Sequence, residues 1–475
     1  MLNPKDFKRE AVPVVDWIDR YMNNIQSFPV KSKVAPGDIY NAIPAKAPLH
    51  SESMEQIMED LDRIILPGMT HWQHPGFHGY FPANSSVESV LAESLTSAMG
   101  AQCMIWETSP AAAELEQRVM EWLRDAMGIP GNFEGVIQDS ASSASLVSLI
   151  TAREVATGFR SNEEGVPPNL RVYCSKETHS SIEKGVAVCG IGTKNLVKIG
   201  VDQQMRMDPA ELEARIREDL DAGLKACAVV AAIGTTGTVA VDPLEEIAAI
   251  CKKYGIWLHV DAAYAGTALL LPEYSWMIKG IEQADSFVFN PHKWMFTNFD
   301  CSVYLVKDAG LLIKTFEILP EYLKTKTRGA VNDYRDWGVP LGRRFRALKL
   351  WFVIRSFGLE GIREKLRAHI ELNNNFTRAL VQIDSMQLPL EPFLNFTCFR
   401  LQPEGVENPE ALNRINEAFL EEINRSGKLF LTHTKINGLF TIRMLIGQTY
   451  VKEEDVEQAL ELITVAAALN RGSNH

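Results

Sequence analysis

The sequence contains no run of about eighteen consecutive apolar residues, so no transmembrane helix is expected. Its first ten residues, MLNPKDFKRE, are charged and lack the apolar stretch of a secretory signal. An excess of positive charge is also missing, because the formal net charge is −12 at pH 7. That balance gives no reason to expect binding to nucleic acid or to an anionic membrane. We therefore expect a cytoplasmic protein.

Cysteine is scarce and follows no pattern of a metal site or a disulfide framework. The seven cysteines are scattered, and none forms a Cys-x-x-Cys or a Cys/His cluster. Most lie in apolar runs such as KACAVVAA, where a free thiol behaves as a small apolar side chain. This usage favours a reducing compartment and argues against a bound metal.

The length of 475 residues exceeds the size at which a single core normally stops growing. We expect a helical arm at 1–86, a large domain at 87–360 and a smaller domain at 361–475. Apolar positions within 5–25 form one face of a helix, and a proline-rich extended segment follows them. Because such an arm has little core of its own, we expect it to pack on a partner subunit.

Short apolar runs alternate with helical segments from about residue 135. Two of the helices, at 209–220 and 243–254, are expected to begin with Asp208-Pro209 and Asp242-Pro243, an N-cap residue followed by proline. The candidate strands are 135–138, 171–175, 226–234, 256–260, 286–290 and 301–306. This alternation predicts an α/β fold with a mostly parallel sheet covered on both faces, with ligands at the carboxyl ends of its strands.

A lysine follows one of these strands. Lys293 lies in SFVFNPHKWMF, beside His292 and Trp294 and three residues beyond the apolar run. A half-buried ammonium group loses pKa, which makes its neutral amine available to attack an aldehyde. The alternative is an ordinary lysine that extends from a strand-end loop to the surface.

An aspartate follows another strand, 32 residues earlier. Asp261 lies in IWLHVDAAYAG, and a buried carboxylate is costly unless it is paired. The ring N–H of pyridoxal phosphate is such a partner, and an aspartate there keeps the ring protonated as an electron sink. By itself Asp261 could equally be an N-cap residue or a metal ligand. Together, Asp261 and Lys293 indicate a pyridoxal-phosphate site.

Small residues after the first strand predict a binding site for an anion. The segment DSASSAS (139–145) precedes a helical run, so backbone N–H groups and the helix dipole can face a phosphate. In contrast, GIGTKN (190–195) lacks the third glycine of a dinucleotide fingerprint, which disfavours a nicotinamide oxidoreductase.

Further motifs complete the pattern: HWQHP (71–75), GYFP (79–82), SPAAAELE (109–116), THSS (178–181), GTTGT (234–238) and DYRDWGVPLGRRFR (333–346). With HVDAAYAG and NPHKW, in this order, the chain resembles the aromatic L-amino acid decarboxylases, which are group II pyridoxal-phosphate enzymes of fold type I. The resemblance implies a homodimer with active sites at the subunit interface and a seven-stranded central sheet. It also implies conversion of dihydroxyphenylalanine, tyrosine, tryptophan or 5-hydroxytryptophan to the arylalkylamine and CO2.

The resemblance also implies roles for individual residues. Lys293 should hold the cofactor, Asp261 should pair with the ring nitrogen, and His179 should stack on the ring and approach the substrate carboxylate. The phosphate should be held by Ala141, Ser142 and Asn290, and the pocket completed by Thr236, Ala263 and His292.

Tyr334 lies in KTKTRGAVNDYRDWG, a stretch without clear periodicity that predicts a mobile loop. By resemblance, this loop closes over the neighbouring subunit's site, and Tyr334 or His179 returns a proton to Cα after CO2 leaves. Related aldehyde synthases carry phenylalanine in place of this tyrosine and divert the reaction to oxygen. The alternative is a merely exposed loop tyrosine.

The substrate side chain should meet an aromatic wall, although such a stripe of aromatic residues is often only core. Gln102 and Met104 stand where animal relatives carry isoleucine and phenylalanine, and Ala83 replaces a threonine. Gly358 resembles the residue of members that accept bulkier rings. The full set of expected substrate contacts is Trp72, Tyr80, Phe81, Pro82, Ala83, Gln102, Met104 and Gly358.

Three alternatives stay open. A glutamate decarboxylase or an aminotransferase shares the expected fold, but a glutamate enzyme would need a cationic group for the distal carboxylate, which Trp72, Tyr80 and Phe81 do not offer. A catalytically silent scaffold protein would lack at least one of Lys293, Asp261 and Tyr334, and all three are present.

Overall fold

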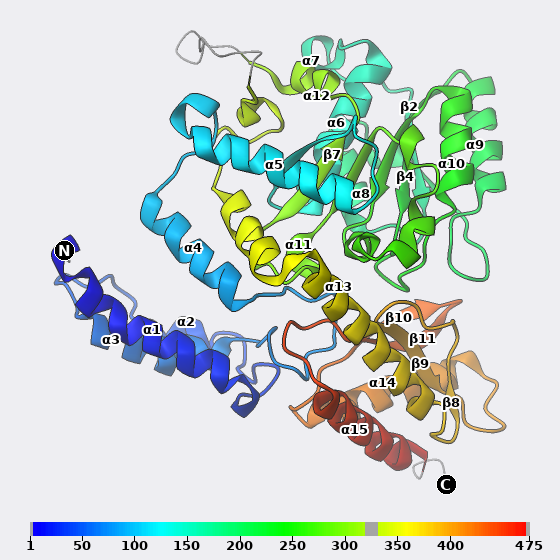
Figure 1. Cartoon of the computed structure of the whole chain (residues 1–475). Coiled ribbons are helices and arrows are strands. Elements are labelled where there is room, and N and C mark those ends of the chain that lie inside the picture. The colour runs from blue at the N-terminus through cyan, green and yellow to red at the C-terminus, as the bar shows by residue number, and fades with distance from the viewer. Residues whose placement is uncertain (1–2, 319–330, 472–475) are drawn as a thin grey trace. The chain divides into compact units, whose positions relative to one another are not determined.

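The structure is a computed structural model that describes residues 3–318 and 331–471 (Figure 1). Its internal contacts divide the chain into two compact units. The large unit comprises Ala83–Glu371 and Leu390–Phe396, and the small unit comprises Met1–Pro82, Leu372–Pro389 and Thr397–His475. Most of the predicted arm and most of the predicted C-terminal domain therefore fall in the small unit, whereas 83–86, 361–371 and 390–396 belong to the large unit. That the arm packs on a partner subunit stays a prediction.

A seven-stranded sheet forms the centre of the large unit, in the order β1-β7-β6-β5-β4-β2-β3. Strands β3, β2, β4, β5 and β6 run parallel, whereas β7 is antiparallel to both β6 and β1. Every residue of β5, β6 and β7 is buried, so both faces of the sheet are covered, as predicted. The strands are β1 Glu134–Gln138, β2 Leu170–Ser175, β3 Leu196–Ile199, β4 Lys225–Ala232, β5 Trp257–Asp261, β6 Ser286–Phe289 and β7 Ser302–Val306.

The sequence patterns located six of these strands and missed β3. This strand has only four residues and pairs with β2 alone at the edge of the sheet. Leu196 and Val197 are only partly buried there, so β3 lacks the continuous apolar run that marks the interior strands.

Helices cover both faces of the sheet in the large unit. The helices of the large unit are α4 Val87–Met99, α5 Pro110–Ala126, α6 Ala141–Thr157, α7 Ser161–Glu164, α8 Ser180–Val188, α9 Pro209–Asp221, α10 Leu244–Tyr254, α11 Pro291–Trp294, α12 Ala309–Phe316 and the first part of α13 Arg346–Leu380. Single 3-10 or π turns lie at Pro4–Asp6, Ile25–Ser27, Leu61–Ile65, Leu66–Gly68, Trp106–Thr108, Thr193–Asn195, Ala265–Leu270, Pro272–Ile278, Ile281–Gln283 and Tyr334–Asp336.

One of the two predicted N-cap residues is wrong, although α10 begins within one residue of the predicted start. Asp208 caps α9 by accepting hydrogen bonds from the N–H groups of Ala210 and Glu211. Asp242 does not cap α10, because its buried carboxylate accepts from the N–H groups of Met207 and Ala232, each at 2.8 Å. Burial raises the pKa of Asp242 to about 6, and these two bonds oppose the shift.

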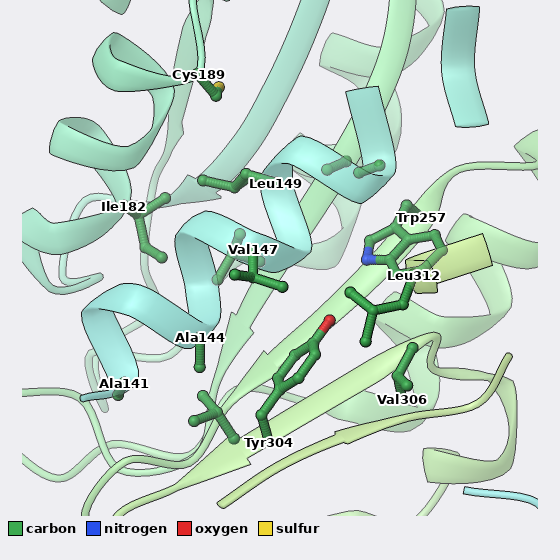
Figure 2. Close-up of a cluster of buried hydrophobic side chains, with 14 of the residues drawn as sticks. Ala141, Ala144, Val147, Leu149, Ile182, Cys189, Trp257, Tyr304, Val306 and Leu312 are labelled. Carbon is green, nitrogen blue, oxygen red and sulfur yellow. The ribbon is translucent and has the colours of Figure 1, made fainter. Parts of the chain in front are cut away.

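A buried polar network fixes α6 on the sheet beside an apolar cluster of α6 and sheet residues (Figure 2). Ser148 lies 2.7 Å from the hydroxyl of Ser286 on β6 and accepts a 2.9 Å bond from the indole of Trp257 on β5. His259 bonds Ser145 on one side and Ser286 on the other. Burial lowers the pKa of His259 to about 4, so its ring is neutral in the core. The network therefore holds β5 and β6 in place two residues before Asp261.

The small unit contains a four-stranded sheet in the order β10-β11-β9-β8. Phe399, Phe419 and Ile442 are among the residues that pack its core. Its elements are α1 Phe7–Asn23, α2 Asp38–Ala42, α3 Met54–Asp60, β8 Met386–Gln387, β9 Phe396–Leu401, α14 Pro409–Arg425, β10 Thr432–Ile436, β11 Leu439–Leu445 and α15 Glu453–Arg471. Among the described residues of both units, no helix combines the length and apolarity needed to cross a membrane.

Gly358 has a structural explanation of its own. It interrupts α13 with φ 67° and ψ 163°, a backbone conformation that essentially only glycine adopts. A Cβ added there would meet no atom of the described residues within 4 Å, so the constraint is backbone strain rather than space. Its predicted contact with substrate stays a prediction.

We expect Gly358→Ala to lower the stability of the protein by about 1–3 kcal/mol, because alanine is strained at this φ. Gly361→Ala is the matched control, since Gly361 lies in the same helix without a positive φ. The control should be neutral or stabilising by up to about 1 kcal/mol. Thermal unfolding of both variants measures the difference, and equal melting temperatures would contradict this account of Gly358.

Candidate active site

Asp261 and Lys293 lie at the carboxyl ends of adjacent parallel strands. Asp261 is the last residue of β5 and stands in register with Val288 of β6. Beyond the ladder, the Asn290 N–H donates to the Ala263 carbonyl at 3.0 Å, and the Lys293 N–H donates to the Asn290 carbonyl at 2.9 Å. These bonds continue the strand pairing into α11, which carries Lys293.

The two side chains share one electrostatic environment. Burial lowers the pKa of Lys293 to about 8, and the charge of Asp261 opposes that shift. Asp261 is 8% exposed, and its Oδ1 accepts a 3.1 Å bond from the Ala263 N–H. Within residues 3–318 and 331–471, no group donates to the other oxygen, Oδ2. A buried carboxylate with one uncommitted oxygen fits the ring N–H of pyridoxal phosphate, and an amine with a lowered pKa fits its aldehyde.

His179 stands at the start of α8, which follows β2. Its Nδ1 accepts a 3.2 Å bond from the Ser181 N–H and lies 2.8 Å from the Ser181 hydroxyl. Because a backbone N–H can only donate, Nδ1 carries no proton and the neutral ring holds its proton on Nε2. Burial lowers the pKa of His179, while the charge of Asp261 raises it and that of Lys293 lowers it. His179 is therefore within electrostatic range of both residues.

The predicted phosphate residues gather where β1, β6 and β7 meet. Ala141 and Ser142 form the first turn of α6, whose N-cap Ser140 accepts from the Ser143 N–H at 3.2 Å. Ser302 of β7 is in register with Gln138 of β1, and its hydroxyl donates to Asn290 Oδ1 at 2.6 Å. This bond orients the Asn290 amide, and its NH2 group has no partner among the described residues. The first turn of α6 and the Asn290 amide can therefore donate to an anion.

The remaining predicted cofactor residues line the same edge of the sheet. Thr236 is exposed in the turn after β4, and Ala263 is partly buried just after β5. His292 is buried in α11, and its Nδ1 accepts a 2.9 Å bond from the Cys301 N–H.

Sequence reasoning missed Asn84. Its backbone N–H donates to the His292 carbonyl at 2.9 Å, and its side-chain amide donates to the Lys293 carbonyl at 2.6 Å. Asn84 is 2% exposed, so it holds the backbone of α11 from inside the protein. Only its position two residues after the GYFP motif could have drawn attention to it.

The contacts of Tyr334 do not include this group. The alternative of a merely exposed loop tyrosine is wrong, because Tyr334 lies in the buried turn Tyr334–Asp336. That the surrounding stretch forms a mobile loop stays a prediction. Part of that stretch, 324–330, lies outside the described residues. Tyr334 itself is 2% exposed and packs in the core of the large unit, 5.3 Å from Trp337 between ring centroids. The Arg343 guanidinium lies 4.8 Å from its ring centre. Its hydroxyl is buried, and no hydrogen bond to it meets the geometric criteria among residues 3–318 and 331–471. Burial raises the pKa of Tyr334, and the nearby Asn332 side chain opposes that shift.

The predicted substrate residues fall in both units. In the small unit, Trp72 and Tyr80 stack with ring centroids 5.9 Å apart and are 36% and 51% exposed. Phe81 and Pro82 follow them, and Ala83 begins the large unit. There, Gln102 Oε1 accepts from the Arg343 N–H at 2.8 Å, and the Met104 carbonyl accepts from the Arg335 N–H at 2.9 Å.

Known proteins resemble the whole chain. Residues 36–402 match the pyridoxal-dependent decarboxylase conserved domain. A phenylacetaldehyde synthase of Arabidopsis thaliana is 42% identical, covering 96% of this chain and 94% of the relative. Tyrosine decarboxylase 2 of Narcissus pseudonarcissus is 39% identical, covering 98% and 95%. The crystal structure of Oryza sativa TDC with PLP and tryptamine matches with a TM-score of 0.95 at 33% identity, covering 98% of this chain and 99% of that one.

Proposed function

The chain belongs to the pyridoxal-dependent decarboxylase family, and we propose that it converts an aromatic L-amino acid to its arylalkylamine and CO2. It is a carboxy-lyase that depends on pyridoxal phosphate. The observation that carries the proposal is the pair of Asp261 and Lys293 at adjacent strand ends, a buried acid and an amine with a lowered pKa.

Each residue of the proposed site has its own role. Pyridoxal phosphate, when bound, supplies an electron sink for the pair released as CO2 leaves. Lys293 holds the cofactor through its amine, which burial makes nucleophilic near neutral pH. Asp261 Oδ2 keeps a proton on the ring nitrogen, and His179 presents Nε2–H to the substrate carboxylate. Ala141, Ser142 and Asn290 donate to the phosphate.

The aromatic character of the small unit supports an aromatic substrate. Trp72, Tyr80 and Phe81 offer stacking surfaces and no charge of their own. Arg443 lies 5.6 Å from the ring centre of Phe81 but is 5% exposed. A glutamate decarboxylase would need an accessible cation there, so Arg443 is a poor candidate for that role.

A panel of Tyr, dihydroxyphenylalanine, Trp, 5-hydroxytryptophan and Glu, supplied with cofactor and read by product identity, tests the reaction. We expect amines from aromatic substrates and none from Glu. Lys293→Arg should remove the visible absorbance of the bound cofactor and nearly all turnover, because arginine has no amine for the aldehyde. Lys349→Arg is the matched control, since Lys349 is also buried with a pKa lowered to about 8 but pairs with Glu93. Turnover of Glu, or normal turnover by Lys293→Arg, would refute the proposal.

The proton that completes the amine needs a donor, and its assignment to Tyr334 stays a prediction that the burial of Tyr334 argues against. A hydroxyl enclosed in the core of its own chain cannot reach a cofactor without leaving that core. Tyr322 is the other tyrosine nearby in sequence, and it lies outside the described residues. His179 is the further candidate donor, through Nε2.

We therefore expect Tyr334→Phe to leave the ratio of amine to aldehyde unchanged. Tyr322→Phe should divert product to the aldehyde and consume oxygen if Tyr322 is the donor. Both variants replace a tyrosine hydroxyl with hydrogen, so each controls for the other. Oxygen uptake and product analysis measure the outcome, and aldehyde formation by Tyr334→Phe alone would assign the proton to Tyr334 after all.

We also propose that the enzyme is a homodimer, and an apolar stripe on α4 supports this. Val87, Leu91, Leu95 and Met99 recur every four residues and are 45%, 57%, 49% and 56% exposed. Residues four apart lie on one face of a helix, so these side chains form a continuous apolar surface. A second copy of this chain would cover it.

Replacing both Leu91 and Leu95 with Glu should shift the mass measured by light scattering from dimer to monomer, because two charges would be buried in the interface. Leu220→Glu is the control, since Leu220 is 40% exposed on α9 outside the stripe. A monomeric wild-type protein, or a double variant that stays dimeric, would contradict an interface at α4.

A further inference from the structure

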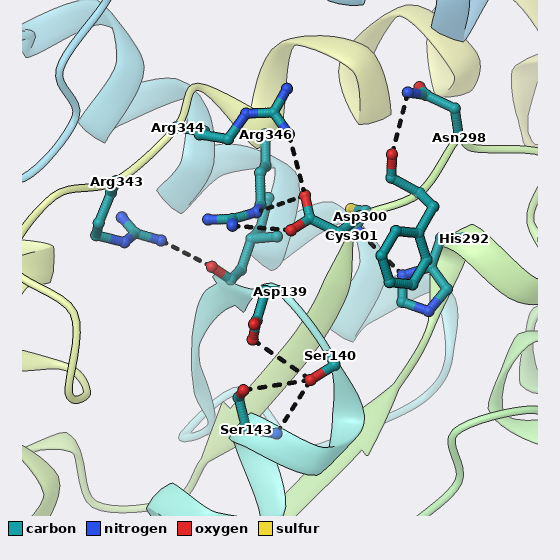
Figure 3. Close-up of polar contacts among 12 residues, drawn as sticks. Asp139, Ser140, Ser143, His292, Asn298, Asp300, Cys301, Arg343, Arg344 and Arg346 are labelled. Carbon is teal, nitrogen blue, oxygen red and sulfur yellow. Dashed lines mark hydrogen bonds and ion pairs between the residues drawn. The ribbon is translucent and has the colours of Figure 1, made fainter. Parts of the chain in front are cut away.

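His292 is held by the backbone that begins β7 (Figure 3). The ring nitrogen Nδ1 of His292 accepts a 2.9 Å hydrogen bond from the backbone N–H of Cys301. The backbone N–H of His292 donates to the Cys301 carbonyl at 3.3 Å. Cys301 precedes the first residue of β7, so its buried N–H lies outside the strand ladder and would otherwise lack a partner. The Nδ1 atom therefore carries no proton.

The other ring nitrogen of His292 is thereby defined as a donor. A neutral imidazole has one N–H, which must be on Nε2 when Nδ1 accepts. Burial lowers the pKa of His292 to about 3. The charges of Lys293 and Lys349 lower this pKa further, and the charge of Asp300 raises it. The ring is therefore neutral at physiological pH. No described residue forms a hydrogen bond with Nε2.

An ion pair anchors the segment that holds His292. Arg346 grips Asp300 with two hydrogen bonds, from Nε to Oδ1 at 3.1 Å and from Nη2 to Oδ2 at 3.0 Å (Figure 3). Both side chains are largely buried, at 14% and 16% exposure, and Arg344 adds a longer contact at 3.5 Å. Burial alone would raise the pKa of Asp300, but the bonds from Arg346 lower it. The carboxylate is therefore ionised and fixes the peptide that presents the Cys301 N–H.

We infer that Asp300 and Arg346 are positioning residues whose ion pair holds the Cys301 N–H against His292 Nδ1, so that His292 presents Nε2–H to an anionic oxygen of the bound cofactor. This inference rests on the proposed place of His292 in the cofactor pocket. In the sequence, His292 lies between Asn290, a proposed phosphate ligand, and Lys293, which is proposed to hold the cofactor. Neither Asp300 nor Arg346 need touch the cofactor to act in this way.

Cofactor affinity of the apoenzyme tests the inference by a double-mutant cycle. Titration with pyridoxal phosphate should show a Kd raised about tenfold to a hundredfold in His292→Leu, which removes one hydrogen bond to a charged group. His292→Gln should restore part of the affinity, because its amide can place an N–H near the same point. Arg346→Gln should raise Kd in the wild-type background and have little further effect in the His292→Leu background. Asp300→Asn should behave like Arg346→Gln.

A nitrogen-15 spectrum of histidine-labelled apoenzyme gives a readout independent of binding. The His292 signals, identified by their loss in His292→Gln, should show a proton on Nε2 alone in the wild type and a mixture of both tautomers in Arg346→Gln. The matched control is Arg367→Gln, because Arg367 grips Glu273 with bonds of 2.8 and 3.1 Å elsewhere in the large unit. That variant should change neither the tautomer nor Kd.

Several outcomes would overturn the inference. If Arg346→Gln raised Kd equally in the wild-type protein and in the His292→Leu variant, the ion pair would not act through His292. Its role would then be to stabilise the structure in general. Unchanged affinity in His292→Leu would remove His292 from the cofactor site. A wild-type chain that binds no pyridoxal phosphate would instead refute the proposed function itself, which separates the two failures.

Discussion

The parallel pairing of β5 with β6 is the interaction on which the site depends. Successive side chains of a strand point to opposite faces, so a shift of one residue in this pairing would turn Asp261 away from its present position. The hydrogen bonds beyond the ladder, from Asn290 to Ala263 and from Lys293 to Asn290, carry the same alignment into α11. An acid and an amine from distant parts of the sequence can therefore act on one ring.

This pairing is held by polar groups inside the protein as well as by the ladder. Ser148, His259 and Ser286 link α6 to both strands, and the lowered pKa of His259 keeps that histidine uncharged. Such a network specifies position because each buried hydrogen-bonding group would be left unpaired if the strands slipped. The same helix places its first turn, with Ala141 and Ser142, at the edge of the sheet where Asn290 lies. One helix thus sets both the register of the strands and the position of the proposed anion site.

The sequence allowed the fold and the central pair to be predicted because their signals are local. Interior strands are short apolar runs, and Asp261 and Lys293 directly follow two of them. Contacts between distant residues carry no such signal. Asn84 holds the carbonyl of Lys293 across 209 positions, and Arg346 holds Asp300 across 46. Asp242 shows how a local rule fails, because its sequence fits the N-cap pattern while its carboxylate accepts from N–H groups of two other segments instead.

The role that the resemblance gives Tyr334 stays a prediction, because the surroundings of this residue do not support it. The polar residues around it predict a loop, but Trp337, Arg343 and the core of the large unit enclose it. The relatives include both a tyrosine decarboxylase and a phenylacetaldehyde synthase. The acid and the amine that we propose bind the cofactor do not distinguish these two reactions. Loss of CO2 needs only the electron sink, whereas the product depends on whether a proton or oxygen reaches Cα next. In the reaction proposed here, a donor on a separate segment would select between amine and aldehyde, and that segment could change without disturbing β5 and β6.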